Sequence, residues 1–283
     1  MSDMAAAGTR RPTDVPVHPF DEAIELEPTE LAGRLRGRTR PDWANMVGPF
    51  GGMTAAVLLR AVEVQPERIG EPLALTVNFA APVADGPFDI AVKAVRTNRT
   101  NQHWLVELWQ DGAVKTNATA VFGLRRDTWS DTERAVPPVP APADVAESGL
   151  PDMIVWARNY EMRYVEGGVP GPGAQPEPSS VTTLWARDRR GRALDFPSLT
   201  AMSDIFYPRV FLRQGAMSPA GTISLTTYFH ADAQALHAAG GDFVLARAEA
   251  NRFSRGYFDQ SAELWSAAGE LLVTTHQLVY FKA

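Results

Sequence analysis

Two stretches in the first half of the chain decide the fold: Gly52–Val64, which reads GMTAAVLLRAVEV, and Leu73–Phe79, which reads LALTVNF. In the first, apolar side chains such as Met53, Val57 and Val62 recur close to helical spacing. The second alternates apolar and polar residues, which is typical of a half-buried antiparallel strand. Together they predict a helix that packs on a sheet.

The alternation continues through the rest of the first half. Further strands are expected at Phe88–Val95, Trp104–Trp109 and Val114–Phe122. Asp111-Gly112, between the last two, is a hairpin turn signal. With one more strand expected before the helix, the first half is a helix and about five strands.

The second half repeats this order, and LTTYF at 225–229 mirrors LTVNF at 75–79. The run Ser198–Val210 (SLTAMSDIFYPRV) is expected to begin as a helix with Ser198 as its N-cap, and to end or kink at Pro208. The strands that follow are expected at Thr222–Phe229, Asp242–Ala250, Gly256–Trp265 and Leu271–Phe281. One helix wrapped by one antiparallel sheet, given twice, predicts a two-layer α+β architecture.

Proline content marks the boundaries of the two units. Residues 1–18 lack periodicity and are expected to form a disordered tail. Residues 127–150 carry four prolines between positions 137 and 142 and are expected to be a linker. The linker separates an N-terminal unit, 19–126, from a C-terminal unit, 151–283.

Composition excludes several kinds of function. The 283 residues include no cysteine, which excludes disulfides, thiolate zinc sites and cysteine nucleophiles. The formal net charge of −6 argues against nucleic acid or an anionic membrane as a partner. No apolar run reaches the roughly 18 residues that cross a bilayer. The alanine cluster near the N-terminus is shorter than the apolar part of a signal peptide, so no signal peptide and a cytoplasmic location are expected.

Standard catalytic signatures are absent as well. The chain has no G-x-S-x-G elbow, no P-loop and no H-E-x-x-H, and its five histidines show no metal-ligand spacing. No metal or cofactor is therefore expected.

Three polar residues stand out against the apolar pattern. Asp204 is the only acid in the second expected helix and points away from its apolar stripe, so a solvated face is the alternative to a site. Thr222 opens a strand on the side opposite Ile223 and Leu225, where a routine strand threonine is the alternative. Gln277 shares the apolar face of the last strand; its buried amide needs hydrogen-bond partners, in a structural network or a catalytic site.

A pair of glycines, Gly51-Gly52, opens the first helix after Phe50. Glycine there leaves bare backbone N–H groups at the positive end of the helix dipole. The alternative is a flexible helix entry. The run Phe50–Val62 contains no carboxylate, so one centre per chain is expected.

The order and spacing of these residues resemble the acyl-CoA thioesterase II family, whose members are double hotdogs, with two helix-in-sheet repeats in one polypeptide. The resemblance runs from about Phe50 to the C-terminus. The motifs that carry it are Phe50-Gly51-Gly52, Phe79–Pro82, Glu161-Met162-Arg163, Trp185-Ala186-Arg187, Ser203-Asp204, Thr222–His230 and Leu272-Val273 ahead of Gln277.

The resemblance implies a function and a site. Asp204, Thr222 and Gln277 correspond to the Asp, Thr and Gln that position a water in the family. That water would hydrolyse an acyl-CoA thioester to a free acid and CoA, in fatty acid metabolism. The backbone at Gly51 and Gly52 is expected to stabilise an oxyanion.

Further expectations concern CoA, assembly and rival functions. The arginines expected to meet CoA phosphates are Arg96, Arg99, Arg252 and Arg255. A homo-oligomer, dimer or higher, is expected. The alternatives are a non-catalytic acyl-ligand binding protein of the same fold and a hotdog enoyl-CoA hydratase. The hydratase signature has a His five residues after the Asp, where this chain has Arg209.

Overall fold

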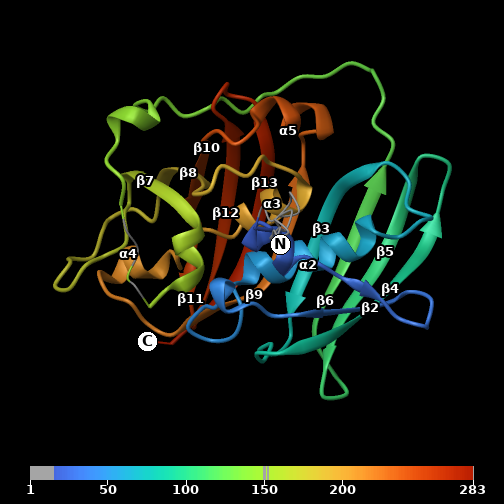
Figure 1. The fold of residues 1–283 in the computed structure, drawn as a ribbon. Helices are drawn as coiled ribbons and strands as arrows, with labels where there is room; N and C mark the ends of the chain where they lie inside the picture. The colour runs from blue at the N-terminus through green and yellow to red at the C-terminus, as the bar shows by residue number, and fades with distance from the viewer. Residues whose placement is uncertain (1–15, 149–150, 152, 283) are drawn as a thin grey trace, which may run out of the picture.

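The computed structural model describes residues 16–148, 151 and 153–282. Thirteen strands in this part of the chain form one sheet in the order β1-β2-β4-β5-β6-β3-β9-β13-β12-β10-β8-β7, with β11 paired to β12. In Figure 1 helix α2 lies in front of the sheet. The strands of the first half are on the right of the view and those of the second half are on the left.

The first half of the sheet belongs to one repeat. Its strand order is β2-β4-β5-β6-β3, and every pairing is antiparallel. Its elements are β2 (Arg34–Arg38), α2 (Gly51–Glu63), β3 (Glu71–Phe79), β4 (Pro87–Thr97), β5 (Asn101–Gln110) and β6 (Ala113–Gly123).

The second half has the same topology. Its order is β8-β10-β12-β13-β9, so the strand before the helix again lies at the far side and the strand after it lies at the junction. The elements are β8 (Thr182–Asp188), α3 (Phe196–Met202), β9 (Ala220–Phe229), β10 (Val244–Glu249), β12 (Tyr257–Ser266) and β13 (Leu271–Phe281). The predicted duplication and the double hotdog fold are confirmed.

Short elements complete the described chain. They are α1 (Pro19–Ala23), β1 (Glu27–Pro28), η1 (Pro41–Trp43), η2 (Pro142–Asp144), η3 (Val155–Asn159), β7 (Tyr160–Glu166), α4 (Val210–Gln214), α5 (Ala233–Ala239) and β11 (Phe253–Ser254).

The two repeats meet through β3 and β9, the two strands that share the LT motif. Thr76 pairs with Thr226, and their hydroxyl oxygens lie 3.0 Å apart. Leu75 and Thr227 pair on one side of this point, as do Val77 and Leu225 on the other. Equivalent positions therefore face each other, which makes the junction locally two-fold symmetric and the sheet continuous.

The helices also meet at the junction. A Cβ on Gly52 would lie 2.4 Å from the carbonyl oxygen of Ala201, so α2 approaches α3 more closely than any side chain at position 52 allows. This approach brings the first turn of α2 next to the residues that follow α3.

The second helix differs from its prediction. It ends at Met202, well before Pro208, and its N-cap is Asp195 rather than Ser198. Asp195 and Ser198 form a capping box, in which Ser198 is the N3 partner. Because the helix ends early, Asp204 lies in the turn beyond it and not on a solvated helix face.

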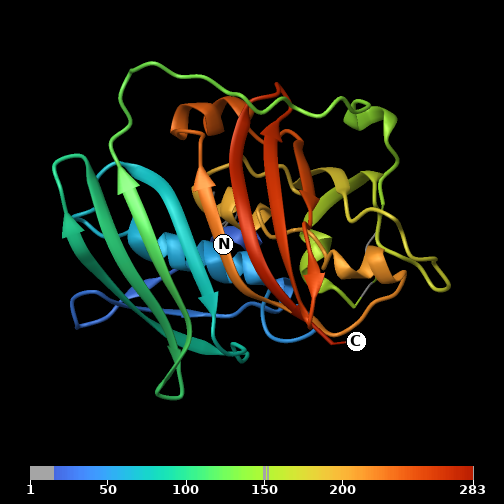
Figure 2. The same ribbon diagram turned by 180° about the vertical axis from the view of Figure 1, so that it is seen from behind.

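The predicted linker is packed against the C-terminal repeat. It runs from the first repeat to the second along the top of the view in Figure 2. Val139 and Val145 pack against the cluster of Trp185, Leu245 and Trp265, and the Trp185 indole Nε1 donates to the carbonyl of Pro140. Buried apolar surface on the back of the sheet explains why this proline-rich stretch lies along it.

The predicted tail falls mostly on residues 1–15, which are outside the described residues. Its last residue, His18, belongs to the first unit instead. His18 caps α1 by accepting from the Phe20 N–H, and its Nε2 lies 3.2 Å from Asp188 of the second unit.

Candidate active site

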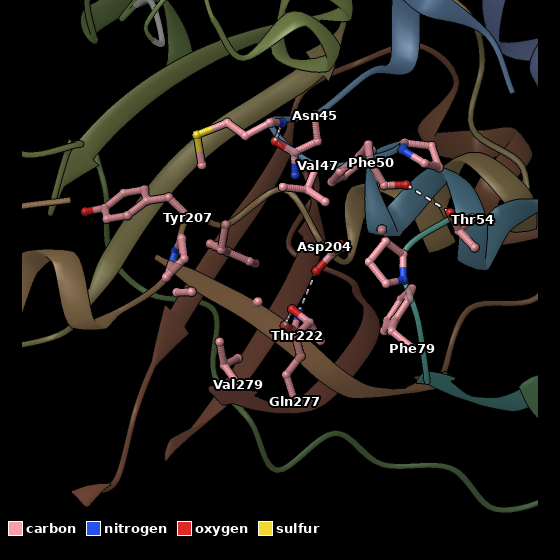
Figure 3. Close-up of a pocket in the computed structure, with 18 of the residues that line it drawn as sticks. Asn45, Val47, Phe50, Thr54, Phe79, Asp204, Tyr207, Thr222, Gln277 and Val279 are labelled. Atoms are coloured by element: carbon pink, nitrogen blue, oxygen red, sulfur yellow. Dashed lines mark hydrogen bonds between the residues drawn. The ribbon is translucent and has the colours of Figure 1, made fainter. Parts of the chain in front are cut away.

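A cavity of about 430 Å³ lies at the junction of the repeats. Its wall combines apolar side chains with Asp204, Thr222 and Gln277, as Figure 3 shows. The apolar part of the lining comes from both repeats and includes Val47, Phe50, Phe79, Ile154, Trp156, Phe211 and Val279. The structure thus brings together three residues that the sequence separates by up to 73 positions.

Asp204 lies at the centre of this polar group. Gln277 Nε2 donates a hydrogen bond of 2.9 Å to its Oδ1. The backbone N–H of Gly52, from the other repeat, also donates to the carboxylate. Its second oxygen faces Gly51, since a Cβ there would lie 2.7 Å from Oδ2. Only a glycine at position 51 leaves the carboxylate in this place.

Gln277 is buried, as the strand pattern predicted, with 4% of its surface exposed. Its Oε1 accepts a hydrogen bond of 3.1 Å from the hydroxyl of Thr222. The amide therefore uses its oxygen toward Thr222 and its nitrogen toward Asp204. With these two partners, both polar atoms of the Gln277 amide are hydrogen-bonded in only one orientation of the side chain.

Thr222 reaches Gln277 because of an irregularity in β9. Gln277 pairs with Leu225, Leu278 with Ser224, and Val279 with Thr222, so Ile223 is an extra residue. Such a bulge shifts the alternation of side chains. The sequence prediction that Thr222 lies opposite Leu225 is therefore wrong: both lie on the inner face.

Burial governs the acidity of the group. Removal from water raises the pKa of Asp204 to about 7, while the hydrogen bonds from Gln277 and Gly52 lower it. A carboxyl with a pKa near 7 can both take up and release a proton at neutral pH.

The four arginines predicted for CoA lie outside the cavity wall. Arg96 and Arg99 are in or next to the β4–β5 turn, and the strand register places Arg96 level with Ala74, roughly 15 Å along β3 from Phe79. The structure does not bring these two to the cavity. Arg252 and Arg255 flank β11, at the same end of the sheet as Tyr280 of the cavity wall.

The first repeat lacks a copy of the group. Its strands place Ala120 opposite Leu75, where the second repeat has Gln277 opposite Leu225. Because an alanine side chain cannot hydrogen-bond to a carboxylate, one such centre is present in the described chain.

Among the polar residues of the wall that sequence reasoning missed, Gln260 lies next to Gln277. Its side chain is 1% exposed, lies in the wall, and pairs across strands with Gln277. The signal was available, because Gln260 alternates with Phe258 and Ala262 as Gln277 does with its apolar neighbours. The sequence drew attention to Arg209 only because a hydratase would have a histidine there. In the structure, Arg209 Nε donates to Gln260 Oε1 at 3.2 Å.

Two kinds of feature are absent from the described residues. No group of three or more His, Cys, Asp or Glu side chains there could hold a metal ion. Nor does any helix in this part of the chain have the length and apolar character to span a membrane.

The fold and the position of the site define a double-hotdog protein, and comparison with known proteins gives the family. Residues 39–123 match the profile of the acyl-CoA thioesterase N-terminal domain, and residues 133–281 match that of the C-terminal domain. The chain therefore belongs to the acyl-CoA thioesterase family.

Solved structures resemble the chain over nearly their whole length. A conserved protein of unknown function with a hot dog fold from Alicyclobacillus acidocaldarius is 45% identical, with a TM-score of 0.89; 94% of this chain and 98% of that one are covered. A putative thioesterase II from Thermobifida fusca is 19% identical (TM-score 0.81, coverage 95% and 99%). An acyl-CoA thioesterase II from Mycobacterium marinum is 18% identical (TM-score 0.74, coverage 93% and 98%), and these two show the fold alone. A search of curated proteins finds no match.

Proposed function

We propose that this protein hydrolyses acyl-CoA thioesters to a carboxylic acid and CoA, with a water molecule as the nucleophile. The observation that carries the proposal is the hydrogen-bonded chain Thr222–Gln277–Asp204 in the wall of a largely apolar cavity. The family of the chain supports the same class of reaction.

Asp204 acts as the general base, with Thr222 and Gln277 orienting the water. The water oxygen forms a bond to the thioester carbon, and its proton passes to the Asp204 carboxylate. The carbonyl electrons move onto oxygen, then return as the C–S bond breaks and the CoA thiolate leaves with the electron pair. A thiol has a pKa near 8.5, so the thiolate departs without a strong acid. It then accepts the proton that Asp204 took from the water.

The helix entry has two roles in this proposal. The Gly52 N–H holds the carboxylate of Asp204. Gly51 lines the cavity at the first residue of α2, where its N–H is suited to the developing oxyanion. The two glycines come from the repeat that lacks the acid, so each repeat contributes a different part of the centre.

The cavity wall and its rim suit the two ends of the substrate. Apolar side chains such as Phe79, Trp156 and Phe211 accommodate an acyl chain. Arg252 and Arg255, at the same end of the sheet, are proposed to meet CoA phosphates. Arg96 and Arg99 are not proposed, since the fold holds them away from the cavity.

Arg209 bears on the hydratase alternative. The guanidinium is fully buried and bonded to Gln260 and to backbone carbonyls, and an arginine does not exchange protons as a histidine does. This favours hydrolysis over hydration.

The experiment is release of free CoA from a panel of acyl-CoA thioesters that differ in chain length and branching. Native protein and Asp204→Asn are compared at equal concentration. We expect the native protein to release CoA from at least one member, and the variant to be about 10²–10⁴-fold slower, the usual contribution of a general base. Equal rates for the two proteins across the panel would contradict the proposal.

A further inference from the structure

A buried arginine lies behind the cavity wall. The Arg209 side chain is fully buried, with its guanidinium 4.3 Å from the ring centroid of Tyr207. Its hydrogen bonds go to neutral oxygens of Tyr207, Gln260, Ser180 and Thr182. Within the described chain no carboxylate pairs with it. Burial lowers its pKa to about 10, so it remains charged at neutral pH.

This arginine fixes which way the Gln260 amide points. A guanidinium carries only donors, so the group that faces it must be the Gln260 oxygen. The amide nitrogen consequently projects away from Arg209. Among the described residues, no hydrogen bond uses this nitrogen, although the side chain is 1% exposed and lies in the cavity wall. An amide N–H in the cavity wall that no protein group accepts is free to donate to a group bound in the cavity.

The position of Gln260 relative to Gln277 indicates what that group is. The two are direct cross-strand partners on the inner face of β12 and β13, which sets their Cβ atoms about 5 Å apart. A donor beside the residue that would orient the water is placed for the oxygen of the bond under attack. The charge of Arg209 polarises the amide, which strengthens its N–H as a donor.

We propose that Gln260 Nε2 donates a hydrogen bond to the thioester carbonyl oxygen and to the oxyanion that forms there, with Arg209 as its positioning residue. The inference rests on the proposed hydrolysis. It adds a side-chain donor to the backbone N–H of Gly51, and leaves the proton transfer to Asp204 unchanged. Gln260 thus stabilises the negative charge that develops on the carbonyl oxygen.

The test compares Gln260→Glu with the native protein. Glutamate has the same length and pairs with Arg209, but offers an acceptor where the oxyanion needs a donor. We expect kcat for an acyl-CoA thioester to fall at least 100-fold. The Kd for the S-alkyl-CoA thioether of the same chain length, which lacks the thioester carbonyl oxygen, should change less than threefold. Ser261→Ala, on the next residue of the strand, is the matched control and should retain native kcat.

Two results would overturn the inference: a kcat within threefold of native, or a thioether Kd that weakens in proportion to the loss of kcat, which indicates a structural role. If Gln260→Glu does not fold, Gln260→Met, which fills a similar volume without charge, is put to the same comparison. Asp204→Asn is run alongside. Native protein that releases no CoA overturns both proposals, whereas an Asp204→Asn defect with active Gln260 variants overturns only this one.

Discussion

Gln277 Nε2 donates to Asp204 Oδ1 at 2.9 Å, and this bond ties the last strand of the sheet to the turn after α3. It holds one carboxylate oxygen, while the other faces the first turn of α2. The acid is therefore fixed by both repeats, and its environment sets the pH range in which it can act.

The first prediction concerns the pH dependence of activity. Because the pKa of Asp204 is about 7 and the base must be ionised, kcat/KM should rise tenfold per pH unit below 7 and level off above it. Gln277 lowers this pKa, so Gln277→Met should move the rising limb to higher pH as well as reduce the plateau. Initial rates between pH 5 and 9 measure both. A flat profile over this range would show that Asp204 is not the base.

The second prediction concerns stability. The folded pKa of Asp204 lies above its ordinary value of 3.8, so the folded state binds the proton more tightly and loses stability as pH rises from about 4 to 7. Asp204→Asn cannot ionise and should be more stable than the native protein at pH 8, by about 1–3 kcal/mol. The difference should shrink at pH 5.

Urea unfolding at the two pH values measures this difference. Asp111→Asn, at an exposed turn, is the control and should show no such pH-dependent gain. A gain in Asp204→Asn that is equal at pH 5 and pH 8 would mean that ionisation of Asp204 is not its source.

The third prediction isolates the hydroxyl of Thr222. Thr222→Val keeps the shape but removes the donor to Gln277 Oε1, so we expect kcat to fall roughly 10-fold or more. Thr222→Ser keeps the hydroxyl and should recover most of the rate. Thr226→Val, on the outer face of the same strand, should have native kcat. Equal activity of the valine and serine variants at position 222 would remove Thr222 from the mechanism.

The fourth prediction separates the two glycines. A Cβ at Gly51 would meet Asp204 Oδ2 at 2.7 Å, so Gly51→Ala should lower kcat more than tenfold with little loss of stability. A Cβ at Gly52 would meet the backbone oxygen of Ala201 at 2.4 Å, so Gly52→Ala should force the helices apart and cost about 1–3 kcal/mol.

Thermal unfolding and CoA release together measure the two effects. Gly171→Ala, in an open loop where an added Cβ meets nothing within 4 Å, is the control for both. The assignment fails if Gly51→Ala remains fully active, because the carboxylate would then not depend on the bare backbone.

Much of the fold follows from local sequence. The period-two runs predicted strands β3 to β6, and the run Leu271–Phe281 has the bounds of β13. The likeness of LTVNF and LTTYF predicted the duplication, because each repeat must bury the same face of a strand. The bounds of α3 could not be read so well. The helix starts at the Asp195 capping box, three residues before the expected N-cap, and it stops at Met202 although the apolar pattern continues to Phe206.

For the site, the sequence by itself determined which side chains are out of keeping with an apolar interior: an acid, a threonine at a strand end and a buried amide. Only the tertiary structure decided that they meet. A bulge at Ile223 rotates Thr222 onto the inner face, and burial of Asp204 at the junction of the repeats raises its pKa. The bulge depends on how β9 pairs with β13, and the burial depends on how the two repeats pack, so neither follows from the periodicity of one segment.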